Sequence, residues 1–196
     1  FSITGGSDIT ATLDGSDITF TGLDNFNGSE TFTITASDTE LSDSQNITVT
    51  VNAVNDAPVA TTGLSGTTNE DQDIIMNLSG FDVDGDALTF TTDTPVNGSI
   101  VVNGNIATYS PNQDFNGSDS FNFTVNDGQL DDTASVTLII DPVNDAPIFI
   151  TSLLDSVDED IEYNFTLEVG DIDNSIDDLY TSILSAPSWL SISNFT

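Results

Sequence analysis

Val54-Asn55-Asp56-Ala57-Pro58 and Val143-Asn144-Asp145-Ala146-Pro147 are identical pentapeptides within one chain. They lie 89 residues apart, counted from Asp56 to Asp145. Self-similarity at a fixed period is the signature of tandem repeats, so we expect successive structural units of about 90 residues. The pentapeptide contains a proline that favours an extended backbone at the preceding residue. It is therefore predicted to be the joint between units.

The same offset relates stretches on both sides of the joint. It pairs Phe20 with Tyr109, Phe26-Asn27-Gly28-Ser29 with Phe115-Asn116-Gly117-Ser118, Glu70-Asp71 with Glu159-Asp160, and Asp82-Val83-Asp84 with Asp171-Ile172-Asp173. In this frame Phe1 takes the position of Phe90. We therefore expect residues 1–56 to be the C-terminal part of one repeat, residues 57–145 a complete repeat, and residues 146–196 the N-terminal part of a third. Half a sandwich cannot bury both faces of its sheet, so the frame predicts a longer array.

The segments between the joints alternate apolar and polar residues, which is the period of a strand with one buried face. Examples are Thr31–Thr35, Asn46–Val51, Ser120–Val125 and Ser135–Ile140. Turn dipeptides such as Asp14-Gly15 and Asn103-Gly104 separate them, and no stretch has a helical period. The pattern predicts an all-β chain of tandem Ig-like β-sandwiches, with Phe32, Phe121 and Phe123 in their cores.

The charge of the chain limits the partners it can have. It contains 33 acidic residues and no lysine, arginine or histidine, which gives a formal net charge of −33. Nucleic acids and anionic lipids are repelled by such a surface, whereas divalent cations are attracted to it. Because 37% of the residues are hydrophobic, the acidity belongs to a folding chain and not to a disordered tail.

Two further absences narrow the class of protein. The chain has no cysteine, so it has neither disulfides nor thiolate metal sites. No apolar run reaches the roughly 18 residues that a membrane-spanning helix requires. An enzyme is the least expected class, because histidine, lysine, arginine and cysteine are all missing. The acidic pair Asp131-Asp132 is then expected to lie in a solvated loop.

Asp141-Pro142-Val143-Asn144-Asp145-Ala146-Pro147-Ile148-Phe149 resembles the linker of cadherins. Together with Glu70-Asp71, Asp82-Val83-Asp84-Gly85-Asp86 and Val125-Asn126-Asp127-Gly128, it resembles the tandem cadherin-like repeats of large bacterial surface adhesins of the RTX type. The third unit, with Asp171, Asp173 and Pro187-Ser188-Trp189-Leu190-Ser191, is similar to the dystroglycan-type subgroup. The resemblance implies Greek-key sandwiches with calcium-binding linkers, secretion to the cell surface, and a spacer or adhesive role.

Calcium prefers six to eight hard oxygen ligands, and the second joint offers Asp141, Asn144 and Asp145 within five residues. The resemblance implies that Glu70, Asp119, Asp171 and Asp173 complete that site. At the first joint it implies Glu30, Asn52, Asn55, Asp56, Asp82, Asp84 and Asp127. Asn52 stands where the second joint has Asp141, so we expect calcium to bind less tightly at the first joint.

The sequence leaves two other functions open. One is a calcium-dependent module that binds a carbohydrate or another ligand on a partner cell, which exposed aromatic side chains near the acidic loops would favour. The other is an extracellular fibre in which a strand of one chain completes the sandwich of the next. The leading hypothesis remains calcium-rigidified extender repeats of a secreted, cell-surface bacterial adhesin, with calcium and the neighbouring repeats as partners.

Overall fold

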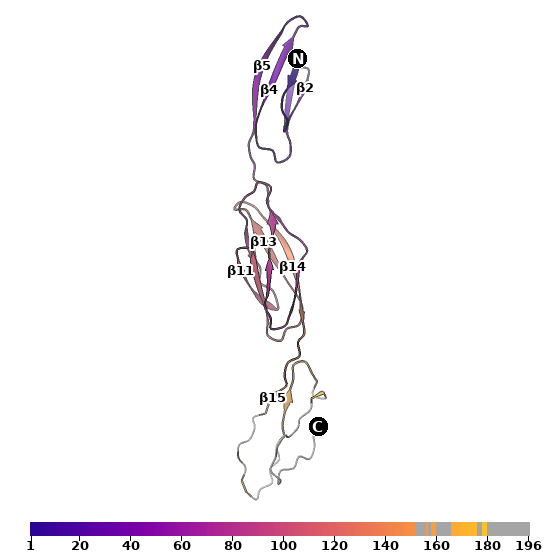
Figure 1. The fold of residues 1–196 in the computed structure, drawn as a ribbon, viewed down its shortest axis with the longest axis vertical. Helices are drawn as coiled ribbons and strands as arrows, with labels where there is room; N and C mark the ends of the chain where they lie inside the picture. The colour runs from indigo at the N-terminus through magenta and orange to yellow at the C-terminus, as the bar shows by residue number, and fades with distance from the viewer. Residues whose placement is uncertain (152–155, 157, 160–165, 176–177, 180–196) are drawn as a thin grey trace.

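The computed structural model describes residues 1–151, 156, 158–159, 166–175 and 178–179. Within these residues the chain forms sixteen β-strands and no α-helix, as its alternating pattern predicts. Figure 1 shows the strands in groups that follow one another along the long axis of the molecule. Residues 52–58 and 142–147, which contain the repeated pentapeptides, have no strand and form the joints.

The central group of strands forms a β-sandwich. Its larger sheet has the order β10-β13-β14-β7 and consists of β10 (Thr89–Thr92), β13 (Gly117–Asn126), β14 (Asp131–Asp141) and β7 (Leu64–Asn69). The smaller sheet has the order β11-β12-β8 and consists of β11 (Gly98–Asn103), β12 (Ile106–Pro111) and β8 (Ile74–Asn77). All these pairs are antiparallel except β14 with β7, which run parallel. The short strands β6 (Val59–Ala60) and β9 (Gly80–Phe81) pair with each other, and Ala60 is part of the buried core of the sandwich.

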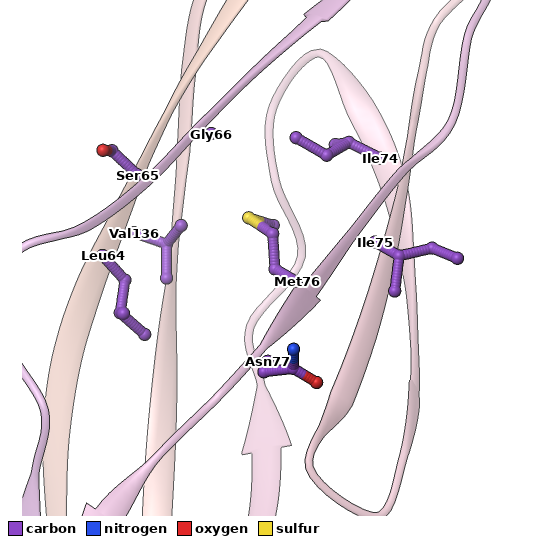
Figure 2. Close-up of a pocket in the computed structure, with 8 residues that line it drawn as sticks. All are labelled: Leu64, Ser65, Gly66, Ile74, Ile75, Met76, Asn77 and Val136. Atoms are coloured by element: carbon purple, nitrogen blue, oxygen red, sulfur yellow. The ribbon is translucent and has the colours of Figure 1, made fainter.

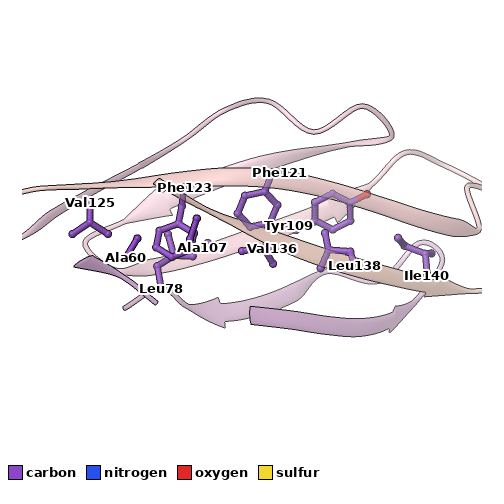
Figure 3. Close-up of a cluster of buried hydrophobic side chains, with 11 residues drawn as sticks. Ala60, Leu78, Ala107, Tyr109, Phe121, Phe123, Val125, Val136, Leu138 and Ile140 are labelled. Carbon is purple, nitrogen blue, oxygen red and sulfur yellow. The ribbon is translucent and has the colours of Figure 1, made fainter. Parts of the chain in front are cut away.

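The core lies between the two sheets, and Figure 3 shows its side chains stacked along β13 and β14. Phe121, Phe123 and Val125 are buried and alternate with exposed or half-buried residues, because successive side chains of a strand point to opposite faces. Val136, Leu138 and Ile140 do the same on β14. The buried positions of Phe121 and Phe123 confirm the register expected from their alternation.

The N-terminal group has two sheets. One has the order β1-β4-β5 and consists of β1 (Ser2–Thr4), β4 (Gly28–Ser37) and β5 (Ser42–Val51). The other pairs β2 (Ile9–Asp14) with β3 (Asp17–Gly22). Phe32 is fully buried and packs against Phe20, with their ring centroids 5.0 Å apart. The pairing of Gly28 with Val51 reappears 89 residues later as Gly117 with Ile140, so the sequence period is also a structural period.

In the third group the structure describes β15 (Ile148–Phe149) paired with β16 (Val169–Gly170). Asp160, Trp189 and the rest of Pro187–Ser191 lie outside the described residues, and so does most of the resemblance to the dystroglycan-type subgroup. Across the described part of the chain, no helix is long and apolar enough to cross a membrane.

Candidate metal centres at the joints

Asp82, Asp84 and Asp86 form an acidic cluster in the loop that follows β9. Each offers a carboxylate oxygen, and these oxygens lie within 4.8 Å of one another. Asp82 is only 6% exposed. Its Oδ1 accepts hydrogen bonds from the backbone N–H groups of Asp84 (2.9 Å) and Asp86 (3.2 Å), whereas its Oδ2 is buried and has no hydrogen-bond partner. A buried, unpaired carboxylate oxygen is costly, so Asp82 is a residue that could hold a cation.

This cluster touches the first joint through hydrogen bonds to the linker. The N–H of Asp56 donates to Oδ2 of Asp84 at 2.8 Å. The side-chain amide of Asn55 donates to Oδ2 of Asp127 at 2.8 Å. Asp127 also accepts from the backbone of Leu130 and Gln129, and these bonds, with that from Asn55, lower the pKa of its carboxyl group. Of the residues predicted for this joint, Asn55, Asp56, Asp82, Asp84 and Asp127 are thus brought together.

The second joint repeats the same arrangement. The N–H of Asp145 donates to Oδ2 of Asp173 at 2.6 Å, which is the Asp56–Asp84 bond shifted by one period. Oδ1 of Asp171 accepts from the N–H groups of Asp173 and Asn174, and its Oδ2 is buried without a partner. Although desolvation acts in the opposite direction, these hydrogen bonds lower the pKa of Asp171. The amide oxygen of Asn144 accepts from Asn174 at 3.1 Å.

Another acidic cluster lies at this joint and contains residues of both the central unit and the linker. Carboxylate oxygens of Asp71, Asp114 and Asp145 lie within 4.8 Å of one another. Oδ2 of Asp145 is buried and has no hydrogen-bond partner. Desolvation, followed by the charges of Asp114, Asp173, Asp71 and Glu70, raises the pKa of Asp145. A hollow of about 390 Å³ is lined by Asp114, Asp145 and Asp171, so the cluster has room for an ion.

Glu70 fixes the linker to the central sandwich. Its side chain is 3% exposed, and Oε1 accepts a hydrogen bond from the N–H of Val143. Oε2 accepts from the side-chain amide of Asn116 at 3.4 Å. The N–H of Glu70 in turn donates to the carbonyl oxygen of Asp141 at 2.9 Å. Glu70 therefore contacts the linker of the second joint, whereas the side chains of Asp141 and Asn52 are exposed.

Glu30 and Asp119 have other partners than those the sequence suggested. They are 89 residues apart and occupy equivalent places in β4 and β13. Glu30 accepts hydrogen bonds from the hydroxyl and N–H of Ser7 and from the N–H groups of Asp8 and Ile9. Asp119 is 7% exposed and accepts from the hydroxyl of Tyr109 and from the N–H groups of Asn97 and Ser120. Both carboxylates thus bind within their own sandwich and are not members of the acidic clusters.

Sequence reasoning missed Asp71, Asp86 and Asp114 as site residues. Asp86 continues the alternation of Asp82 and Asp84, which was a usable signal. Asp71 and Asp114 were harder to find, because they come from different loops and meet only in the fold. Both have a left-handed backbone, with φ of 58° and 57°, which aspartate adopts more readily than most residues.

Residues 55–139 match the family model described as a bacterial Ig domain. No curated protein matches the chain.

Solved structures with similarity include protocadherin gamma B7 extracellular domains 1–4, at 14% identity and a TM-score of 0.43, covering 89% of this chain and 51% of that one. Drosophila N-cadherin EC1-4 matches at 16% identity and a TM-score of 0.42, covering 84% of this chain and 47% of that one. An endo-fucoidan hydrolase of glycoside hydrolase family 107 matches at 23% identity and a TM-score of 0.35, covering 72% of this chain and 23% of that one. The chain therefore spans between about a quarter and a half of these structures, and the likenesses are too low to transfer an activity.

Proposed function

We propose that this chain is a set of calcium-rigidified extender repeats from a secreted bacterial surface adhesin. The observation that carries the proposal is the set of buried carboxylate oxygens without hydrogen-bond partners at the joints, Asp82 Oδ2, Asp145 Oδ2 and Asp171 Oδ2. Each belongs to a group of acids that includes or contacts the linker. A cation is the simplest group that satisfies them, since the chain has no basic side chain.

The donor set fits calcium. All the candidate ligands are carboxylate, amide or backbone oxygens, which calcium prefers and softer transition metals do not. At the first joint Asp82, Asp84 and Asp86 would hold the ion, with Asn55, Asp56 and Asp127 beside them. At the second joint Asp71, Asp114, Asp145, Asp171 and Asp173 would hold it, with Glu70 beside them. Bound calcium would supply the positive charge that neutralises these groups of acids.

Rigidity follows from where these residues lie. The second-joint ligands come from the central unit, from the linker and from the unit that follows, so one bound ion would restrain all three. Without the ion, the carboxylates of Asp71, Asp114 and Asp145 repel one another across less than 4.8 Å. Binding to the folded state alone stabilises it by about 2.7 kcal/mol per site at a hundredfold excess over Kd.

The module class also supports a spacer role outside the cell. The match to a bacterial Ig domain covers most of the central sandwich, residues 55–139, and sandwiches of this architecture occur in many cell-surface proteins. A spacer needs neighbouring repeats as its partners and no catalytic group. We therefore assign the chain no enzymatic activity of its own.

The proposal is tested by small-angle X-ray scattering of the whole chain, first with calcium and then with a chelator. We expect the mean radius of gyration to fall when calcium is removed. The chain should then sample a wider range of conformations, because the joints are free to bend. Asp145→Asn should reproduce part of that change in the presence of calcium. Asp131→Asn removes the same charge from an exposed strand end and is the matched control. Scattering that is identical with calcium and with chelator would refute the proposal.

A second candidate function is calcium-dependent binding of a carbohydrate. Phe81 directly precedes Asp82 and is 66% exposed, so an aromatic ring lies beside the first acidic cluster. Aromatic rings stack on sugar rings, and calcium can coordinate sugar hydroxyls. Calorimetric titration with acidic and neutral polysaccharides, using wild type and Phe81→Ala, tests this function; heat that is equal for both proteins or absent for both would exclude it.

A further inference from the structure

Strand β8 lies at an unpaired edge of the central sandwich. It pairs with β12 on one side, through Ile106 with Asn77 and Tyr109 with Ile74. In the described part of the chain no strand pairs with its other side. An unpaired edge presents a row of backbone N–H and C=O groups that can accept another strand. Natural edge strands are commonly protected by charged residues or proline, and β8 (Ile74-Ile75-Met76-Asn77) contains neither.

A groove runs along this edge, between β8 and the edge strand β7 of the other sheet. It has a volume of about 330 Å³ and is lined by Leu64, Ser65, Gly66, Ile74, Ile75, Met76, Asn77 and Val136. Figure 2 shows the side chain of Met76 lying between the two strands, with Val136 and Leu64 across from it. None of the lining residues is charged. Side chains of an added strand could therefore enter the groove without meeting a carboxylate.

None of the residues of β8, β12 and β11 is acidic, and Asp73 directly precedes β8. Ile75 is 68% exposed and lies opposite Thr108 on β12. Thr108 in turn lies opposite Val101 on β11, which is 69% exposed. The row Ile75–Thr108–Val101 thus crosses the sheet without a charge. On a chain with a net charge of −33, an uncharged edge with an uncharged face beside it is a distinct surface.

The charge decides which partner this surface suits. A cationic partner would be drawn to the acids elsewhere on the molecule and gains nothing from this edge. Two strongly acidic chains repel each other overall, and this repulsion is smallest where they meet through surfaces without acids. A second copy of this chain is a strongly acidic partner of this kind, and it carries the same free edge, so the two edges can form a self-complementary contact.

We propose that two copies of the chain associate through antiparallel pairing of their β8 strands. The three-stranded sheets β11-β12-β8 then join into one continuous sheet of six strands across the two copies. A register centred on Ile75 places the two Ile75 side chains opposite each other on the outer face and Asp73 of one copy opposite Asn77 of the other, so no acid faces an acid. A four-residue edge is small, and the association is weak, in the range of about 0.1–1 mM. Many copies held side by side on one surface strengthen such a contact by raising its effective concentration.

The test is sedimentation velocity of the whole chain over that concentration range, with calcium, at low and high salt. We expect a monomer–dimer equilibrium that strengthens with salt, because salt screens the repulsion between two polyanions. Hydrogen exchange of the dimer should show slower exchange in residues 74–77 than in the monomer. A single monomeric species under all conditions would overturn the proposal.

A pair of variants locates the interface. Ile75→Asp puts a like charge into the pairing edge and should raise the dimer dissociation constant at least about tenfold. Val101→Asp is the matched control, since Val101 is equally exposed on the same face but lies at the opposite edge, on β11. Both side chains point outward, so both variants should keep the wild-type circular dichroism spectrum. Equal weakening by both variants, or protection at residues 98–103 in place of 74–77, would assign the contact to another edge and refute the proposal.

Discussion

The hydroxyl of Tyr109 donates a hydrogen bond of 2.8 Å to Oδ2 of Asp119 inside the central sandwich. One period earlier, Phe20 takes the place of Tyr109 and Glu30 the place of Asp119. The phenylalanine has no hydroxyl, and the longer glutamate reaches the hydroxyl of Ser7 instead, at 2.7 Å. In both units, therefore, a carboxylate at this position accepts hydrogen bonds, and only the groups that donate them differ.

The first prediction concerns this buried carboxylate. Asp119→Ala leaves the Asn97 N–H without its acceptor and the Tyr109 hydroxyl with only the longer bond to the Asn97 carbonyl oxygen, and should lower the free energy of unfolding by about 1–3 kcal/mol. Tyr109→Phe removes one donor and leaves Asp119 two others, so it should cost about 0.5–1.5 kcal/mol. Burial, the hydrogen bond to Asp119 and the charge of Asp119 raise the pKa of Tyr109, so it stays a donor at neutral pH. Urea denaturation of both variants measures the difference; a larger cost for Tyr109→Phe would contradict it.

The second prediction is a pH dependence of the N-terminal unit. Hydrogen bonds from the Ser7 hydroxyl, the Ser7 N–H, and the N–H groups of Asp8 and Ile9 lower the pKa of Glu30 to about 2, from an ordinary value of 4.5. Because the folded-state pKa is depressed, the stabilisation is complete above pH 4.5 and is lost as the pH falls toward 2. The hydrogen-exchange protection factors of residues 7–9, which divide the intrinsic rate at each pH by the observed rate, should fall over that range as Glu30 takes up its proton. In Glu30→Gln this pH-dependent fall should be missing.

The third prediction distinguishes the two joints and rests on the proposed calcium sites. Asn25 lies one period before Asp114, and both have a left-handed backbone, with φ of 59° and 57°. The first joint therefore has a neutral side chain where the second has a carboxylate. We expect Asn25→Asp to tighten calcium binding at the first joint about threefold to tenfold, because ligand charge tunes calcium affinity. Calorimetric titration compares the variant with wild type, and an unchanged set of affinities would show that this position is not at the site.

The fourth prediction tests the core. Phe123 is fully buried, so Phe123→Ala should cost about 3–5 kcal/mol through lost burial and the cavity left behind. Ser120→Ala, on the exposed face of the same strand, should change stability by less than about 0.5 kcal/mol. Thermal and urea unfolding of the two variants decide this. Similar losses in both would mean that the register of β13 is wrong.

The fifth prediction compares two glycines in β11 and its turn. A Cβ at Gly98 would lie 2.6 Å from both the backbone oxygen of Ser110 and the ring of Tyr109, so Gly98→Ala should cost about 1–3 kcal/mol or more. Gly104 has open space around it but a φ of 63°. Gly104→Ala should therefore cost only the left-handed backbone penalty, about 1–2 kcal/mol. A smaller loss at Gly98 than at Gly104 would contradict the close packing of β11 on β12.

Much of the fold was predictable because it depends on local periodicity. The alternation in Ser120–Val125 placed Phe121 and Phe123 in the core, and the structure buries both. The domain boundaries at residues 56 and 145 and the calcium ligands themselves remain predictions. Unlike the strands, the candidate site was only partly predictable. The repeated linker pointed to Asp56 and Asp145, and the resemblance to cadherins pointed to Asp84 and Asp173, which accept their N–H groups. Glu30 and Asp119 form their hydrogen bonds within their own sandwiches.

The sequence by itself determined the all-β class, the period of 89 residues and the repetition of the acidic linker. These features can be read from the order of the residues, because strand alternation and repetition do not depend on which loops come together in the fold. Only the tertiary structure decided that Asp71, Asp114 and Asp145 share one cluster, and that β8 is left as a free, uncharged edge. The reason is physical: both results depend on how two sheets close over one core, which brings together loops and edges that lie far apart along the chain.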